Sequence, residues 1–550
     1  MTALSHLSPT LAATEVAGGY LPHLLLGMYM VLLIALCIAG YLKGQATEED
    51  YYLAGRGQGT LVTSLTIMAT FFSSAALLGI PGVVYRDGAS FFLFALNLPV
   101  AGIGVYLLGD RMRKLGKARG FVTPADLVGD YYGGSAVRLL AATVSTLYVL
   151  PYVIMQIKAG GYLAQRLFPD APPLEAFGQS FTMYETGVWV LSFLTMAYVL
   201  VGGMRSVAWT DVVQGILLLT GMLVAGVATL AYFGGPAGYF EEVGKLPVEA
   251  LSAPGNSGKW NAGVLFTICA FAALGAIMQP AQWMRFFSAR DSDTLRRSAL
   301  IFAVLLPICF LFGIMLVAMG GQVLFPPEVT ANGVMPHPEV GSKAGEVDQI
   351  VIVMIQKTVP EMLGVTFGAI VVTIILIAVL AASMSTADSN LHALGAVLTR
   401  DVYDRFVRPD ASEREKTWFG RIVIVLGTLA AVGLVEWSEQ AEGFNPLALI
   451  AQLMLLAIAF SAQLLPVAID SLFLHKGTRQ GAVAGMLAGL AIVLLLTAKP
   501  EWSFGLTNYA HLSAVGALAN ALVFALVSIF TEKLPEKRVD EFRRILETKD

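Results

Sequence analysis

Two pairs of adjacent hydroxyl residues lie inside apolar stretches of this chain. Ser385 and Thr386 are neighbours in LAASMSTADSNLH, where Ala382 comes three residues before Ser385, and Ser73 and Ser74 are neighbours in MATFFSSAALLGIPG. A small hard cation needs about five or six oxygen ligands. Neutral hydroxyls and freed backbone carbonyls can supply them without holding the ion so tightly that it cannot leave. These residue types are therefore typical of a site that binds and releases a cation.

A packing role explains the same residues. Ser and Thr in an apolar helix often donate to the carbonyl four residues earlier, and small side chains let two helices approach closely. The segment AASMSTADS is also a continuous run of small residues. The pattern alone leaves both interpretations open.

Two apolar stretches are interrupted at corresponding places. The first interruption is the segment 68–82, which ends on Gly-Ile-Pro-Gly, and the second is Gly-Ala-Ile-Met-Gln-Pro at 275–280; each lies about a dozen residues into its stretch. A break in a membrane helix frees backbone carbonyls, which is tolerated at bilayer depth only against protein or a hydrated cavity. Paired breaks favour the midplane site of an inverted-repeat transporter, although Gly and Pro also serve packing and mild kinks in membrane helices.

The elements that must position these residues are membrane helices. The chain has 550 residues, of which 56% are hydrophobic and 13% charged, whereas soluble chains carry about 25% charged residues. Apolar runs long enough to cross a bilayer recur along it. They predict an all-α polytopic membrane protein with about thirteen transmembrane helices, at roughly 21–42, 60–83, 89–109, 138–168, 186–203, 212–233, 261–283, 297–322, 364–398, 418–437, 446–473, 481–498 and 511–531.

Ten of these spans divide into two halves of five. The halves are expected at 60–233 and 261–473, as a first and a second inverted repeat, because an odd number of spans gives the two halves opposite orientation. The segment 1–59 would hold an extracellular N-terminus, the first transmembrane helix and a cytoplasmic loop. Two peripheral transmembrane helices would occupy 481–531, and a cytoplasmic tail 532–550.

The distribution of basic residues predicts the orientation in the membrane. One set of loops and adjoining helix ends holds 27 of the 35 Lys and Arg residues, the opposite set holds 7, and Lys158 lies within a span. The positive-inside rule places the richer set in the cytoplasm. We therefore expect an integral protein of a bacterial-type plasma (inner) membrane with its N-terminus outside and its C-terminus in the cytoplasm.

Six motifs in order along the chain resemble the sodium/solute symporter family, which includes sodium-coupled proline, pantothenate, monocarboxylate and glucose transporters. They are YYLAGRG (51–57), GIPG (79–82), VGGMRSVAWTDVVQ (201–214), QPAQWMRFF (279–287), LAASMST (380–386) and TRDVYDRF (399–406). The resemblance covers nearly the whole chain. It implies a five-plus-five inverted-repeat, LeuT-like transporter core with one N-terminal and two C-terminal extra helices.

The resemblance also implies a site for Na⁺, the co-transported ion, between the first broken helix and the ninth span. The oxygens carried over are the backbone carbonyls of Ala69, Phe72 and Ala382 and the hydroxyls of Ser385 and Thr386. On this view the helix breaks so that its carbonyls face the ion, while Ser73 and Ser74 face the solute. Sodium/proline transporters have Asp where Phe71 stands here, so a carboxylate-assisted cation contact at that position is in doubt.

Polar residues around the breaks are the candidate solute contacts. Glutamine both donates and accepts hydrogen bonds, so it suits carboxylates, amides and hydroxyls alike; polar packing is the alternative. The candidates are Ser73, Ser74, Gln156, Met278, Gln279 and Gln282, with Gln452 and Gln463 expected to close the cavity.

Three ionisable residues are expected at or within spans. Asp388 follows Thr386 by two residues, and Asp211 opens the sixth span; both are expected near helix ends that water reaches, as gate or ion-exit residues. Asp211 could instead cap the helix from Val212 onward, since Asp is favoured at N-caps. Lys158 could pair with a solute carboxylate, pair with a protein carboxylate or snorkel from a bent helix.

The function expected from these features is sodium-coupled symport of a small organic solute by alternating access, with no enzymatic activity. A carboxylate-bearing solute, such as a monocarboxylate, an amino acid or pantothenate, is favoured; a sugar or other neutral solute, or coupling to protons, is the alternative. A membrane sensor is disfavoured because about twenty residues follow the last span, and a membrane enzyme because His392 is the one mid-span histidine. A net charge of −4 without a basic stripe argues against nucleic acid. The lipid bilayer is an expected partner; no obligatory protein partner is implied.

Overall fold

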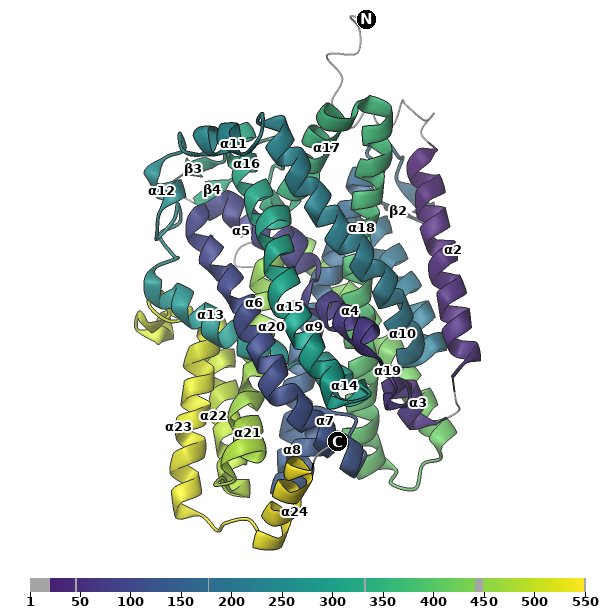
Figure 1. Ribbon diagram of the computed structural model, residues 1–550, viewed down its shortest axis with the longest axis vertical. Helices are drawn as coiled ribbons and strands as arrows, with labels where there is room; N and C mark the ends of the chain where they lie inside the picture. The colour runs from purple at the N-terminus through teal and green to yellow at the C-terminus, as the bar shows by residue number, and fades with distance from the viewer. Residues whose placement is uncertain (1–19, 45–46, 177, 331–332, 441–448, 549–550) are drawn as a thin grey trace, which may run out of the picture.

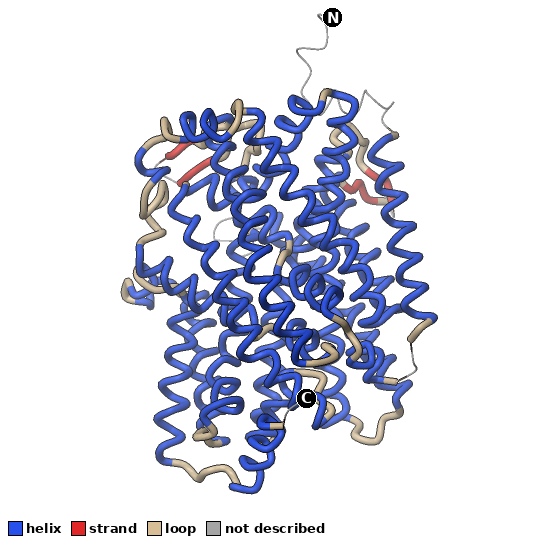
Figure 2. Tube along the Cα trace, viewed as in Figure 1, coloured by secondary structure: helices blue, strands red, loops and turns tan. Residues whose placement is uncertain are grey.

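The computed structural model describes residues 20–44, 47–176, 178–330, 333–440 and 449–548. Ten helices in these ranges are long and apolar enough to cross a membrane, and two bent helix pairs bring the number to twelve. Figure 2 shows a bundle of helices with two short β-hairpins. The all-α polytopic architecture is therefore confirmed, whereas the predicted N-terminal segment up to residue 19 and residues 446–448 of one expected span lie outside the described residues.

Figure 1 labels the helices and strands, and η denotes 3₁₀- or π-helical segments in the text below. The first half contains α2 (Leu21–Leu42), α3 (Glu48–Leu53), η1 (Ala54–Arg56), α4 (Thr60–Phe71), η2 (Ala75–Gly79), α5 (Ile80–Asp87), η3 (Ala89–Leu96), α6 (Asn97–Gly104), η4 (Val105–Gly109), α7 (Asp110–Arg119), α8 (Pro124–Tyr132), α9 (Ser135–Leu167), the antiparallel strands β1 (Leu174–Ala176) and β2 (Gln179–Phe181), and α10 (Met183–Tyr232).

The second half begins with α11 (Pro236–Val243), α12 (Val248–Leu251), α13 (Ala262–Ile277), α14 (Pro280–Ser288), α15 (Ser292–Phe310), η5 (Leu311–Met315), α16 (Leu316–Leu324), the antiparallel β3 (Glu328–Thr330) and β4 (Gly333–Met335), η6 (Ala344–Gln349) and α17 (Ile350–Leu363). It continues with α18 (Val365–Val397), η7 (Leu398–Val407), α19 (Glu413–Gln440), α20 (Ile450–Ser461), η8 (Ala462–Leu464), α21 (Leu465–Ile469), η9 (Asp470–Leu474), α22 (Arg479–Ala498), η10 (Pro500–Ser503), η11 (Leu506–Asn508), α23 (Leu512–Phe530) and α24 (Glu536–Glu547).

Helix α10 combines two of the expected spans. It has 50 residues, and a straight helix of that length would measure about 75 Å, more than twice the hydrocarbon thickness of a bilayer. Gly203 leaves the helical conformation within it (φ 58°, ψ −167°). This backbone conformation is open to glycine and costly for other residues. Dividing α10 at Gly203 restores the expected total of thirteen spans.

Both predicted helix breaks are present. Helices α4 and α5 meet at a bend of 54°, and α13 and α14 at a bend of 55°. The first break lies at Phe72–Ser74, because the π-helical turn η2 and α5 then continue through Gly-Ile-Pro-Gly. Pro81 lies at the start of α5, directly after the π-helical turn η2.

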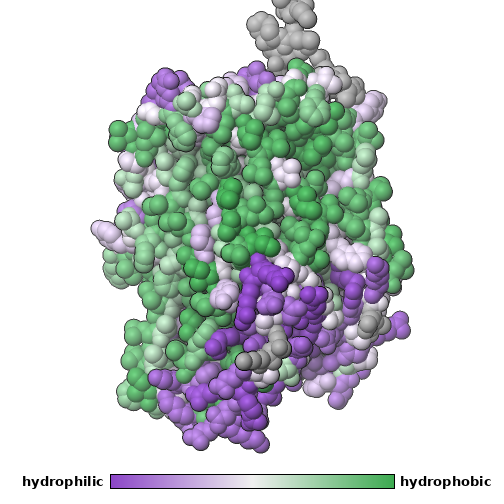
Figure 3. All heavy atoms as spheres, viewed as in Figure 1, coloured by the Kyte–Doolittle hydropathy of each residue, from purple (hydrophilic) through white to green (hydrophobic). Residues whose placement is uncertain are grey.

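Helix α18 lies at the centre of the bundle. It packs against α9, α10, α4 and α14, whereas α22 and α23 pair with each other at the periphery and contact the rest of the bundle through α9, α13 and α20. Figure 3 shows hydrophobic residues over the middle and upper part of one face; hydrophilic residues gather at the lower end, where Figure 1 places α3, α7 and α24. The residues of both breaks are therefore held inside the bundle, next to α18.

Candidate functional site

The end of α4 and the middle of α18 meet through oxygen atoms. The Ala69 carbonyl accepts from the Thr386 hydroxyl at 3.1 Å and from the Ser385 hydroxyl at 3.5 Å, and Ser385 also donates to the Ala382 carbonyl at 3.0 Å. Carbonyls in the last turn of a helix lack partners within that helix, so they are available to such neighbours. The structure thus brings together four of the five predicted ion ligands, all of them buried.

The fifth predicted ligand, Phe72, lies three residues beyond Ala69 in the break. Its backbone (φ −86°, ψ 88°) has left the helix, so its carbonyl no longer points along the axis of α4. The neighbouring Phe71 side chain packs edge-on against Phe302 of α15, with ring centroids 4.8 Å apart. Phe71 is therefore a packing residue in this structure.

The unwound segment is held by Gln156 of α9. The Ser74 backbone N–H and hydroxyl donate to Gln156 Oε1 at 3.0 and 2.7 Å, and Gln156 Nε2 donates to the Tyr152 carbonyl at 3.1 Å. The Ser73 hydroxyl accepts from the N–H of Ala75 at 3.2 Å. In this conformation Gln156 fixes the shape of the break, and Ser74 is its partner.

Residues of the second break face the first. Gln279 Oε1 accepts from the Tyr148 hydroxyl at 2.6 Å, and Gln282 Nε2 donates to the Ile67 carbonyl of α4 at 3.1 Å. Met278 is buried beside them. Among the described residues, Gln279 Nε2 and Gln282 Oε1 are buried without a hydrogen-bond partner. One free donor and one free acceptor therefore remain between the breaks.

Sequence reasoning missed two tyrosines at this place. The rings of Tyr148 and Tyr152 stack at a centroid distance of 4.9 Å and are buried. They precede Gln156 by eight and four residues, so the three side chains share one face of α9. The four-residue spacing of Tyr148, Tyr152 and Gln156 is the feature of the sequence that could have identified these tyrosines.

The structure does not bring Gln452 or Gln463 to this site. The Gln452 side chain is exposed on α20. Gln463 is buried, but its side-chain and backbone oxygens accept from Asn520 of the peripheral helix α23, at 3.1 and 2.8 Å. In this conformation neither residue lines the space between the breaks, because α20 turns Gln452 outward and η8 turns Gln463 toward α23.

A buried charged cluster lies one to two turns further along α18. Arg285 of α14 pairs with Asp211 of α10 at 2.9 Å and also donates to Ser389. Asp388 accepts from Ser389 at 2.9 Å and from the Tyr198 hydroxyl at 2.7 Å. The cluster links the second break to α10 and α18, and sequence reasoning missed Arg285 although it stands in the QPAQWMRFF motif.

Two expectations about these aspartates are wrong. Asp211 is not an N-cap, because α10 is continuous from Gly203 through it. Asp211 and Asp388 are fully buried, so neither lies at a helix end that water reaches. Their charges are compensated inside the protein instead, as buried charges must be.

Lys158 is paired with a protein carboxylate. Its ammonium lies 2.9 Å from Glu439 of α19 and 3.5 Å from the Ser438 hydroxyl, and its side chain is only 2% exposed. Of the three alternatives that the sequence left open, the structure shows the second.

Ion pairs close the bundle at the end where α8 and η7 lie. Arg138 bridges Asp126 and Asp401 at 2.8 and 2.9 Å, and Arg400 binds Asp126 at 2.8 Å. Burial raises the pKa of Asp126, but Arg400 and Arg138 outweigh it and hold the pKa below its ordinary value. Thr123 donates to Asp401 at 2.6 Å. Helices α8 and α9 are thereby tied to the extension of α18.

Comparisons with known proteins agree with this geometry. The model of the sodium:solute symporter family matches residues 51–489. A sodium/proline symporter from Escherichia coli is 27% identical over 535 residues, covering 93% of this chain and 98% of the relative. A sodium/pantothenate symporter from Haemophilus influenzae is 24% identical over 522 residues, covering 94% and 96%.

Two solved structures share the fold. A substrate-bound, outward-open Na⁺-coupled sialic acid symporter superposes with a TM-score of 0.71 at 17% identity, covering 94% of this chain and 99% of the other. A nucleobase-cation-symport-1 family transporter in a closed conformation gives a TM-score of 0.54 at 13% identity, covering 90% and 98%. The expected LeuT-like fold is therefore confirmed.

Proposed function

We propose that this chain, which belongs to the sodium:solute symporter family and is a sodium-coupled solute symporter, carries a small carboxylate-bearing solute into the cell by alternating access. The observation that supports this most directly is the contact of Ser385 and Thr386 with the Ala69 carbonyl. Ala69 of α4 and Ser385 of α18 are 316 residues apart in the sequence and meet through neutral oxygens. A helix contact that served packing alone would not need to place hydroxyls against the end of a broken helix.

We place Na⁺ among the carbonyls of Ala69, Phe72 and Ala382 and the hydroxyls of Ser385 and Thr386. The ion would replace the hydrogen bonds that now join these groups, turning the hydroxyl oxygens from donors to Ala69 into ligands. Neutral ligands bind a monovalent cation without the charge that would prevent its release. Asp211 and Asp388 lie beyond them along α10 and α18, and we assign them to the gate through which the ion leaves.

The solute would lie between the two breaks, lined by Ser73, Ser74, Gln156, Met278, Gln279 and Gln282. A carboxylate suits this space because Gln279 Nε2 is an unused donor. Gln279 is also the N-cap of α14, and the N-terminus of a half-helix attracts anionic groups in transporters of this kind. Proline, pantothenate and sialic acid, the solutes in the names of the compared symporters, all carry a carboxylate.

Alternating access fits the repeat arrangement and the charge distribution. We propose repeats at 60–233 and 261–473, each beginning with its broken helix, with the N-terminus outside and the C-terminus in the cytoplasm of a bacterial-type cell. The ion pairs of Arg138 and Arg400 would then close the cytoplasmic side. A membrane potential of 100 mV contributes about 2.3 kcal/mol for each Na⁺ that enters.

The test is uptake by proteoliposomes with an inward sodium gradient, a proton gradient or neither, using labelled monocarboxylates, amino acids, pantothenate and sugars. The proposal expects one carboxylate-bearing solute to accumulate only with the sodium gradient. Accumulation of a sugar would overturn the solute assignment. Accumulation driven by the proton gradient alone would overturn the coupling ion.

The pair of Lys158 and Glu439 provides a prediction about the solute. Because Lys158 is neutralised by Glu439, the double variant Lys158→Met/Glu439→Gln should keep the KM for the solute within about twofold of wild type. Glu439→Gln alone should destabilise the protein, because it removes a carboxylate that lies 2.9 Å from a buried ammonium. Uptake kinetics and thermal unfolding measure the two effects. A tenfold rise of KM in the double variant would instead make Lys158 a solute contact.

A further inference from the structure

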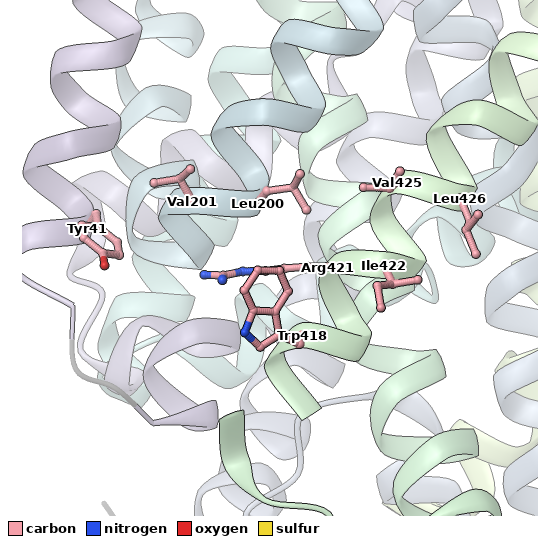
Figure 4. Close-up of a pocket in the computed structure, with 8 residues that line it drawn as sticks. All are labelled: Tyr41, Leu200, Val201, Trp418, Arg421, Ile422, Val425 and Leu426. Atoms are coloured by element: carbon pink, nitrogen blue, oxygen red, sulfur yellow. The ribbon is translucent and has the colours of Figure 1, made fainter. Parts of the chain in front are cut away.

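A groove on the outer surface of the bundle lies between α2, α10 and α19. It encloses about 520 Å³. Figure 4 shows Leu200 and Val201 of α10 on one side and Val425 and Leu426 of α19 on the other, with Tyr41 of α2 at one end. Val201 is 48% and Leu426 60% exposed. The groove is therefore an apolar surface open to the membrane, distinct from the buried site between the helix breaks.

Arg421 is the charged residue among those that line the groove. Figure 4 shows its guanidinium group extending from α19 beneath Leu200 and Val201 toward Tyr41. The group lies over the Trp418 ring, 5.1 Å from its centroid. Among the described residues its Nε is buried without a hydrogen-bond partner. An unpaired buried donor costs free energy, more so when it is charged, so this position favours an anionic acceptor.

Other donors stand near the same end of the groove. The Tyr51 hydroxyl lies beside the Arg421 guanidinium group, which opposes the rise that burial gives the pKa of Tyr51. Arg205, one helical turn after Val201, pairs with Asp50 through its terminal nitrogen while its own Nε is unpartnered among the described residues. Arg421 and Arg205 therefore make the part of the bundle next to the groove rich in hydrogen-bond donors.

The groove lies at the boundary between the apolar and polar parts of the molecule. Helix α2 ends at Leu42, one residue after Tyr41, and Lys43 follows with its ammonium over Trp209. Aromatic residues with Lys and Arg mark the level of lipid headgroups. An occupant of this surface must therefore be amphiphilic, with an acidic group at the level of Arg421 and hydrocarbon along α10 and α19.

We propose that the groove is a binding site for an acidic phospholipid, whose phosphodiester accepts from Arg421 and whose acyl chain lies between α10 and α19. A phosphate oxygen in the groove can accept from the end of the guanidinium group that extends into it, whereas a zwitterionic headgroup would also place a second cation beside Arg421. The acyl chain covers Val201, next to the Gly203 kink of α10. The lipid would therefore join α2, α10 and α19 where α10 changes direction.

The test uses the purified full-length protein in mixed micelles with equal amounts of phosphatidylglycerol and phosphatidylcholine of identical acyl chains. Native mass spectrometry counts the lipids retained as detergent is removed. Wild type should keep one phosphatidylglycerol in preference to phosphatidylcholine, and Arg421→Gln should lower this preference about tenfold, the loss expected for one hydrogen bond to a charged group. Arg414→Gln is the matched control, because Arg414 is exposed on the same helix. This variant should leave the preference for phosphatidylglycerol unchanged.

A second variant tests the groove without altering Arg421, so that the proposal can be tested even if Arg421→Gln does not fold. Leu426→Trp fills the groove at a distance from the guanidinium group, and it should lose the retained lipid while eluting from size exclusion like wild type. An unchanged, wild-type preference for phosphatidylglycerol in Arg421→Gln, or retention of phosphatidylglycerol by Leu426→Trp, would overturn the proposal. An equal loss of the preference in Arg414→Gln would also overturn it, because acidic lipid would then be attracted by surface charge in general. A co-purified protein that occupies the groove would overturn it as well.

Discussion

Sodium-dependent uptake is expected to be lost in the double variant Ser385→Ala/Thr386→Ala. The two hydroxyls are two of the five oxygens that we assign to the ion, and both contact the Ala69 carbonyl. A hydrogen bond to a charged group contributes about 1.5–3 kcal/mol, and we take a cation–oxygen contact to be comparable. Losing two should weaken sodium binding more than about a hundredfold. The measurement is the sodium concentration that gives half-maximal uptake in proteoliposomes.

Ser383→Ala is the control for this experiment. Ser383 is buried on the same helix, and its hydroxyl donates to the Val379 carbonyl at 3.2 Å, within α18 itself. Its removal should leave the sodium dependence unchanged. If the double variant retained wild-type sodium activation, or if Ser383→Ala lost it equally, the hydroxyl pair would be a packing feature and the ion site would lie elsewhere.

The second helix break and the hydroxyl pair could be predicted because their causes are local, whereas the first break lies at Phe72–Ser74, before the Gly-Ile-Pro-Gly segment that suggested it. Pro280 follows Gln279 directly, and a proline removes an N–H that the helix would need, so a break at that point is visible in the sequence. Adjacent hydroxyls in an apolar run are visible for the same reason. The meeting of Ala69 with Ser385 was not a local property, and it came from the family resemblance.

What could not be predicted depends on which helices become neighbours. Arg285 finds Asp211 only because α14 and α10 both contact α18. Lys158 finds Glu439 across 281 residues of sequence. Gln452 was expected at the cavity because its type suits one, whereas its direction in this structure is set by the packing of α20. Residue type indicates what a side chain can do, but the contacts between helices decide which side chains meet.

The second large effect is expected from Arg285→Gln. The Arg285 and Asp211 side chains are 1% and 0% exposed, and removing the arginine would leave two neighbouring carboxylates, those of Asp211 and Asp388, without their cation. Breaking a buried ion pair from one side costs about 3–5 kcal/mol. The variant should therefore unfold at a clearly lower temperature, as followed by thermal unfolding in detergent. Lys245→Gln, which breaks an exposed pair with Glu242, should leave that temperature unchanged.

The double variant Asp211→Asn/Arg285→Gln separates the structural role of the pair from its role in transport. Replacing both charges by amides removes the unpaired carboxylate, so most of the lost stability should return. If Asp211 serves the exit of the ion, the folded double variant should still bind sodium from outside but turn over slowly, which single-turnover uptake would distinguish from loss of binding. Wild-type turnover in a stable double variant would show that the pair only holds α14 against α10, and would remove Asp211 from the gate.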